Sequence, residues 1–199
     1  MEFDPAQLSE PQQYKLMTGT IVPRPIALVT TLGKSGPNAA PFSLFNIVAT
    51  DPPTLFFSSG NQDDGSEKDT IQNLRHSPEF IVHIVNHEMA DRMNICSTNF
   101  PPEINELEKA GFTTAPARKV SPPRIVESPA CFECRMIRII DIGSRHHFVL
   151  GEVVWFHYRD DVVDERLRVN FQKLNPVGRL SGPMYARLTE TFKLERPYL

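Results

Sequence analysis

The chain has 199 residues, a length that favours one domain with a sizeable core. Its 21 basic and 24 acidic residues give a net charge of -3, which leaves no basic surplus to neutralise a phosphate backbone. Hydrophobic residues make up 40% and charged residues 23%, as in a globular rather than a disordered protein. No apolar run approaches the roughly 20 residues that span a bilayer. We therefore expect neither broad nucleic-acid binding nor a membrane segment.

The N-terminus and the cysteines indicate the compartment. The chain starts with Met1, Glu2, Phe3 and Asp4, without the basic start and apolar run of a secretory signal. Three cysteines are too few for a disulfide framework and agree with a reducing environment. Together these features predict a cytoplasmic protein. The 18 prolines, about twice the usual share of roughly 5%, favour strands and loops over long helices.

The first half of the chain predicts strands with a helix at each end. A short helix is expected over 11–18, with Ser9 as its cap and Pro11 in its first turn. Apolar and β-branched residues predict a buried strand over 26–31. Further elements are expected as follows: strands at 38–46 and 54–58, a polar loop at 61–65, and a helix beginning near Ser66 and ending at 76.

The second half predicts helices packed beside strands and a long hairpin. The expected elements are a strand at 80–85, helices at 87–94 and 103–110, and long strands at 131–142 and 146–158 joined by a turn at 143–145. Gly111 ends the second helix in the conformation of positive φ. About six strands without βαβ alternation favour a mainly β fold, an antiparallel barrel with short helices, as one domain over residues 1–199.

Motifs for metal binding and for nucleophilic catalysis are weak or absent. Cys131 and Cys134 have the spacing of half a zinc site, but residues three apart in a strand point to opposite faces, and no second pair exists. We expect core thiols and no metal. Likewise we interpret His83 as a hydrogen-bonded core histidine and Trp155 as a packing residue. The sequence has no Gly-x-Ser-x-Gly elbow, Gly-x-Gly-x-x-Gly motif or phosphate loop.

One polar cluster has two open interpretations. Ser58 and Ser59 end a predicted strand, and Lys68, Asp69 and Thr70 lie near the start of the next helix. The first turn of a helix presents unpaired N–H groups and a positive dipole end, which lysine and hydroxyl groups supplement in a phosphate site. Alternatively, Ser66 or Asp69 is an ordinary N-cap and Lys68 is a solvated side chain.

A series of segments in fixed order resembles the flavin reductase-like family, in its flavoredoxin-type branch. The segments are 22–31, 38–46, Asp51-Pro52-Pro53, Lys68-Asp69-Thr70 with Asn73, Glu79-Phe80, Asn105-Glu106-Leu107-Glu108 with Gly111, Pro122-Pro123-Arg124-Ile125 with Glu127-Ser128, Glu133-Cys134, Gly151-Glu152-Val153, and Arg179 with Gly182 and Tyr185. They cover most of the chain. The resemblance implies an FMN-binding split β-barrel that forms a homodimer, with flavin near the subunit interface.

The resemblance also assigns residues to the flavin. It implies that the FMN phosphate lies among Ser58, Ser59, Lys68, Asp69 and Thr70. The stretch 41–46 would lie along the isoalloxazine ring, with Ser43 and Asn46 as polar contacts. Arg24, fixed between two prolines, would reach the pyrimidine edge or the phosphate. The alternative for Arg24 is a surface arginine in a rigid turn.

On the substrate side the resemblance points to His146, Arg179 and Tyr185. Residues 143–151 match a Gly-Asp-His segment of related flavin reductases in the spacing from His146 to Gly151, but Arg145 stands where that pattern has aspartate. The alternatives are that His146 and His147 merely lie on the two faces of a strand and that Tyr185 packs at the dimer surface.

The resemblance implies hydride transfer from NADH or NADPH to FMN, with reduced flavin passed to a partner monooxygenase. Because the flavin itself carries the hydride, no catalytic nucleophile or base of the protein is required. Two alternatives stay open. One is a non-enzymatic FMN electron-transfer protein, flavoredoxin-like, that a protein partner reduces. The other is a flavin-free binding module.

Overall fold

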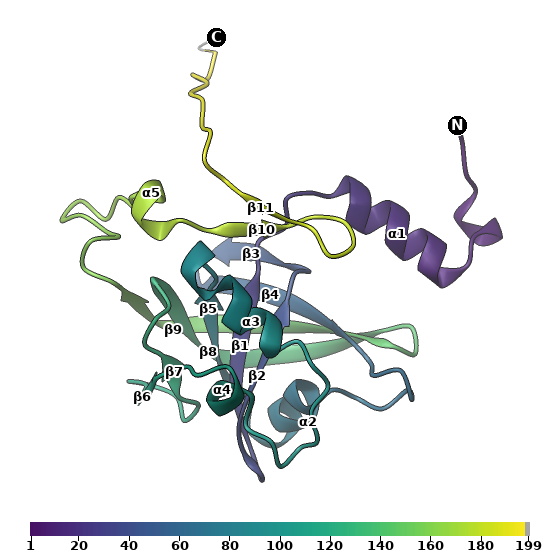
Figure 1. Cartoon of the computed structure of the whole chain (residues 1–199), viewed down its shortest axis with the longest axis horizontal. Coiled ribbons are helices and arrows are strands. Elements are labelled where there is room, and N and C mark those ends of the chain that lie inside the picture. The colour runs from purple at the N-terminus through teal and green to yellow at the C-terminus, as the bar shows by residue number, and fades with distance from the viewer. Residues whose placement is uncertain (198–199) are drawn as a thin grey trace.

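The computed structural model describes residues 1–197 as an antiparallel sheet with short helices around it (Figure 1). Seven strands form the main sheet in the order β2-β1-β5-β8-β9-β4-β3. Their bounds are β1 Ala27–Gly33, β2 Gly36–Phe42, β3 Phe45–Thr50, β4 Pro53–Gly60, β5 Glu79–Ile84, β8 Ala130–Ile142 and β9 His146–Tyr158. Every pairing between neighbours is antiparallel. The mainly β, antiparallel prediction is confirmed.

Helices and two small ladders surround this sheet. The helices are α1 Glu10–Thr20, α2 Asp69–His76, α3 Ala90–Ile95, α4 Glu106–Lys109 and α5 Phe171–Leu174, with 3-10 turns η1 Pro5–Gln7 and η2 His87–Met89. One ladder pairs β6 Thr114–Ala115 with β7 Arg124–Ile125. The other pairs β10 Val177–Arg179 with β11 Tyr185–Arg187. In Figure 1, α1 lies to one side of the sheet, near the turn between β10 and β11. Within the described residues no helix is both long and apolar enough to cross a membrane.

The sheet curls without closing by hydrogen bonds. β2 and β3 are the two ends of the strand order, and no ladder joins them within residues 1–197. The curl nevertheless brings β2 against β4, because the rings of Phe42 and Phe57 lie 4.7 Å apart between centroids. The predicted barrel is therefore an open, curled sheet. Its concave side encloses a core that includes Phe57 and Phe80, both fully buried.

Strand β1 is buried on both faces, which explains its unbroken apolar sequence. Ala27 and Val29 face the core inside the curl. Leu28 faces a second core, which α3 and α4 complete with Met93 and Leu107. Helices α3 and α4 therefore cover the outer face of β1 and of its neighbour β2.

Several predicted boundaries are confirmed. The helix at 11–18 corresponds to α1, and Ser9 and Gln12 form a capping box there. Gly111 has a φ of +69° directly after α4. The predicted hairpin corresponds to β8 and β9, and Gly143 in its turn has a φ of +62°.

Other predictions were wrong at particular residues. The strand at 38–46 is two strands, because the chain leaves one end of the sheet after Phe42 and joins the opposite end at Phe45. Helix α2 starts at Asp69 rather than near Ser66, whose hydroxyl and N–H both bond the Asp64 carboxylate. Trp155 is 40% exposed beside the Lys119 ammonium, so it is not a core packing residue.

Candidate functional site

The N-terminus of α2 presents a run of free backbone donors. The N–H groups of Ile71 and Gln72 both bond the carbonyl of Lys68, which starts the helix. Within residues 1–197, the preceding N–H groups, from Glu67 to Thr70, have no hydrogen-bond acceptor. Lys68 is half-buried, and its ammonium forms no ion pair with any described residue. Free N–H groups, a helix N-terminus and a cation make this point suited to an anion.

A groove runs from this point to the C-terminal part of the chain. Its first pocket, about 60 Å³, includes Lys68, Asp69 and Thr70 in its lining. Its second pocket, about 240 Å³, is lined by Phe42, Ser43, Arg179, Tyr185 and neighbours. Both pockets share Pro41 and Ser97, so they adjoin. The structure thus brings together six of the predicted site residues: Ser43, Lys68, Asp69, Thr70, Arg179 and Tyr185.

A buried polar network forms the wall behind the first pocket. The Thr70 hydroxyl donates to Asn38 Oδ1 at 3.1 Å, and Asn38 Nδ2 donates to Glu106 Oε1 at 2.8 Å. Burial raises the pKa of the Glu106 carboxyl, and the charge of Asp69 raises it further. Burial also raises the pKa of Asp69. Because the hydroxyl of Thr70 is held inside, its contribution to the groove is its N–H group.

The far end of the groove is a stacked pair. The Arg179 guanidinium lies 4.5 Å from the centroid of the Tyr185 ring and donates to the Tyr185 hydroxyl. It also donates to the carbonyl of Gly182 at 2.6 Å. Arg179 and Tyr185 are opposite each other in the β10–β11 ladder, which fixes this arrangement. Both side chains line the second pocket of the groove.

Arg24 is buried rather than on the surface, with only 5% of its area exposed. Its guanidinium donates to the carbonyls of Thr18, Ile21 and Leu180, and its Nε lies 3.5 Å from Ser43 Oγ. Its main chain pairs with that of Arg179. The structure therefore shows Arg24 joining α1, the groove and the C-terminal segment, with its donors directed at protein oxygens.

His146 lies in a separate apolar pocket of about 230 Å³. Met17 of α1, Ile21 directly after that helix, and Leu44 contribute apolar side chains to it. Tyr14 lines both this pocket and the groove, so the two adjoin. His146 thus sits beside the groove rather than within it, with its ring close to Gly60.

Three predicted phosphate or ring contacts do not line the groove. Ser59 is buried, and its hydroxyl donates to the carbonyl of Gly60. Ser58 is paired with Phe148 of β9. Asn46 is exposed on the edge strand β3, where its side chain accepts from the N–H of Ile47. The structure places neither Ser58 nor Ser59 in the lining at the α2 N-terminus, and it does not place Asn46 in the second pocket.

The groove also contains residues that the sequence interpretation missed. Asn38 and Glu106 both fall within segments that carry the family resemblance, yet nothing in their spacing showed that they meet. Tyr14 belongs to a helix that had been assigned no ligand contact. Their convergence depends on the sheet order, which brings β2, α2 and α4 together.

His83 and the three cysteines lie in the core, as expected. His83 is fully buried, bonded to the Leu28 carbonyl through Nδ1 and to the Ile125 N–H through Nε2. All three cysteines are free and buried, and burial raises the pKa of Cys96 and Cys131 to about 12. No group of three or more potential metal ligands occurs in the described part of the chain.

Comparison with known proteins gives consistent matches. The profile of the flavin reductase-like domain matches residues 18–178. The 2-nitrobenzoate 2-nitroreductase NbaA of Pseudomonas fluorescens is 37% identical, with a TM-score of 0.91 over 99% of this chain and 96% of that one. Nitrilotriacetate monooxygenase component B of Bacillus cereus is 36% identical, with a TM-score of 0.93 over 98% of each chain. Flavoredoxin of Desulfovibrio vulgaris shares the fold at 17% identity, with a TM-score of 0.78 over 98% of this chain and 97% of that one.

Proposed function

Because this chain belongs to the flavin reductase-like domain family, we propose that it binds FMN and reduces it with hydride from NADH or NADPH. The observation that carries the proposal is the groove, which joins an anion-binding helix N-terminus to a flat wall. Two structures more than one third identical over nearly the whole chain, a nitroreductase and a monooxygenase component, are in keeping with an oxidoreductase.

The donor set of the groove fits FMN. FMN has a phosphate at one end and a flat ring system at the other. The free N–H groups from Glu67 to Thr70 and the Lys68 ammonium suit the phosphate. The Asp69 carboxyl lies beside them, and as a carboxylate it would repel a phosphate that it faced directly. It is suited instead to accept a hydrogen bond from a hydroxyl of the sugar chain. Pro41 and Tyr185 offer apolar surface to the ring.

In this site the protein binds and orients, while FMN, when bound, supplies a ring nitrogen that accepts hydride. Lys68 and the backbone donors balance the phosphate charge. The Ser43 hydroxyl offers one polar contact along the ring, and the Arg179–Tyr185 pair closes the far end against water. His146 and the apolar side chains around it hold the nicotinamide beside the groove. No residue of the chain has to act as nucleophile or base.

The proposal includes a partner. The similarity to nitrilotriacetate monooxygenase component B covers 98% of both chains and supports delivery of reduced flavin to a monooxygenase. We also propose a homodimer with the flavin near the subunit interface. Exposed apolar side chains on β8 and β9, which are Ile137, Ile140, Ile142, Trp155 and Phe156, support such an interface.

A second candidate is an electron carrier that receives electrons from a protein. The observation that favours it is Arg145, which is exposed and stands where related reductases have aspartate. A carrier keeps FMN bound and has no need of a nicotinamide site.

One experiment separates the two functions. Purified protein is mixed with FMN without oxygen, and its absorbance is followed after addition of NADH and then NADPH. Rapid bleaching of the flavin by either nucleotide supports the reductase and identifies its donor. A yellow complex that neither nucleotide bleaches supports the carrier. A protein that retains no flavin once unbound FMN is removed, and that does not speed the bleaching of added FMN by either nucleotide, refutes both.

A further inference from the structure

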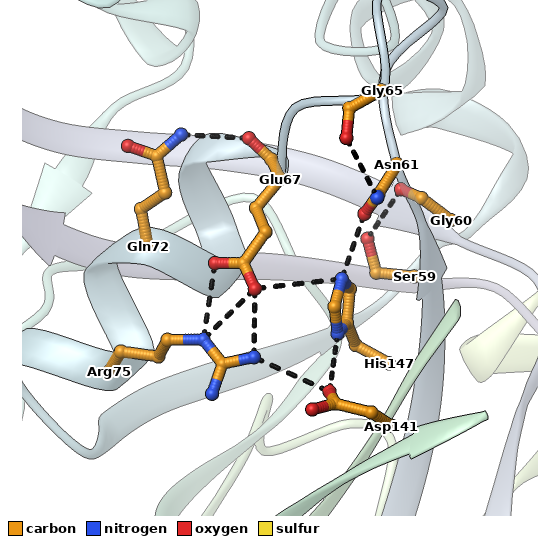
Figure 2. A network of polar contacts seen from close by, with 9 residues as sticks. All are labelled: Ser59, Gly60, Asn61, Gly65, Glu67, Gln72, Arg75, Asp141 and His147. Carbon is orange, nitrogen blue, oxygen red and sulfur yellow. Dashed lines mark hydrogen bonds and ion pairs between the residues drawn. The ribbon is translucent and has the colours of Figure 1, made fainter. Parts of the chain in front are cut away.

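His147, at the start of β9, is nearly enclosed by polar partners (Figure 2). Only 6% of its area is exposed. Its Nδ1 lies 2.7 Å from Asp141 Oδ1 on β8, and its Nε2 lies 2.8 Å from Asn61 Oδ1. Because side chains alternate along a strand, His147 faces away from the pocket that contains His146. The hydrogen-bond partners of His147 are therefore separate from the lining of the His146 pocket.

Both partners of His147 are hydrogen-bond acceptors. The Asn61 amide is oriented by its Nδ2, which donates to the carbonyl of Gly65 at 2.9 Å, so its oxygen faces the imidazole. The hydrogen bond from His147 lowers the pKa of Asp141, which is thus an ionised acceptor near neutral pH. A neutral imidazole has one N–H and can serve only one of these oxygens. Two acceptors at the two nitrogens require the imidazolium.

The surrounding charges agree with this protonation state. Glu67 Oε1 lies 3.7 Å from His147 Nε2. Arg75 of α2 pairs with Glu67 at 2.8 Å and with Asp141 at 3.3 Å. Two carboxylates thus face Arg75 and His147, and an imidazolium makes the cluster neutral. From β4, the neighbouring groups Ser59 and Gly60 are uncharged.

The cluster holds both ends of the loop before α2. Asn61 starts the loop after β4, and its N–H also bonds the carbonyl of Arg145 in the hairpin turn at 2.8 Å. Glu67 ends the loop, and its N–H is the first of the free donors at the α2 N-terminus. A constraint on Asn61 and Glu67 is therefore a constraint on the anion-binding backbone.

We propose that His147, as an imidazolium, is a positioning residue that fixes the loop 61–68 and preorganises the backbone donors for a phosphate. The effect on FMN rests on the proposed function, whereas the protonation state and the loop constraint do not. His147 itself touches neither the groove nor the apolar pocket.

The first test is the FMN affinity of His147→Gln, with His76→Gln as the matched control. His76 is exposed on α2. The substitution His76→Gln therefore removes the same kind of side chain without changing a residue of the cluster. We expect the dissociation constant for FMN to rise about tenfold in His147→Gln and to stay unchanged in the control.

The second test uses the wild-type protein without flavin. Nitrogen chemical shifts of labelled histidine should show both ring nitrogens of His147 protonated near neutral pH. Amide hydrogen exchange of residues 62–67 should be faster in His147→Gln than in His76→Gln. A neutral single tautomer, or equal exchange in the two variants, would overturn the proposal. If the wild-type protein does not bind FMN, the proposed function is refuted. The chemical shifts and the hydrogen exchange then still decide whether His147 is an imidazolium that fixes the loop.

Discussion

Removal of the Lys68 side chain tests the phosphate end of the groove. Lys68→Ala leaves the main chain in place, so the Lys68 carbonyl still accepts from Ile71 and Gln72 and α2 still starts at Asp69. What disappears is an ammonium that has no ion-pair partner among the described residues. The change therefore isolates the contribution of one charge to the binding of an anion.

The expected magnitude follows from this geometry. A hydrogen bond between a charged donor and a charged acceptor contributes about 1.5 to 3 kcal/mol. At about 1.4 kcal/mol for each factor of ten, the dissociation constant for FMN should rise about 10- to 150-fold. The backbone donors from Glu67 to Thr70 remain, so binding should weaken rather than vanish.

The assay is a titration of FMN fluorescence at two salt concentrations. Lys34→Ala is the control, because Lys34 is exposed in the turn between β1 and β2 and does not line the groove. Added salt should weaken binding more in the wild type and the control than in Lys68→Ala. Equal dissociation constants for the two variants would refute the reasoning and reduce the cluster to an ordinary helix start.

Three further changes test other parts of the structure. His146→Ala should slow reduction of the flavin by NADH or NADPH in stopped-flow absorbance and leave FMN affinity nearly unchanged; a parallel loss of affinity would make His146 structural. Burial lowers the pKa of His83 to about 4, below the 6.5 of the unfolded chain, so the unfolded state binds protons first and stability should fall between pH 6.5 and about 4. The free energy of unfolding of His83→Gln, measured with urea, should lack this dependence on pH. An equal dependence on pH in both proteins would contradict the assignment. Gly151→Ala should destabilise the fold by about 1 to 3 kcal/mol in the same assay, since a Cβ there would lie 2.3 Å from Phe80 Cζ; an unchanged midpoint would show that the core repacks freely.

The sequence predicted best those elements that local chemistry determines. The cap at Ser9, the positive φ of Gly111 and the hairpin turn at Gly143 each depend on a few neighbouring residues. Strand β1 was predicted equally well, because a strand that is buried on both faces needs an unbroken apolar run. In these places the local preferences and the final fold agree.

The sequence predicted poorly whatever depends on the order of strands. Nothing near Ser43 indicates that the chain passes there from one end of the sheet to the other. For the same reason Ser58 and Ser59, though close in sequence to the α2 N-terminus, remain held in the pairing of β4 with β9. The meeting of Ser43 with Arg179 follows from contacts between distant segments. Only the family resemblance assigned both Ser43 and Arg179 to the site.

Residue 145 shows how a departure from a family pattern can leave a site intact. In the hairpin turn the main-chain carbonyl of Arg145 accepts the N–H of Asn61, while its side chain is exposed. A carbonyl is the same in arginine and aspartate, so the anchoring of the loop before α2 does not depend on which of them stands here. The next two residues divide the remaining roles, because His146 faces the apolar pocket and His147 faces the loop. The question of a nicotinamide donor thus depends on the exposed side chain of Arg145 and on the side chains around that pocket, and not on the construction of the phosphate end.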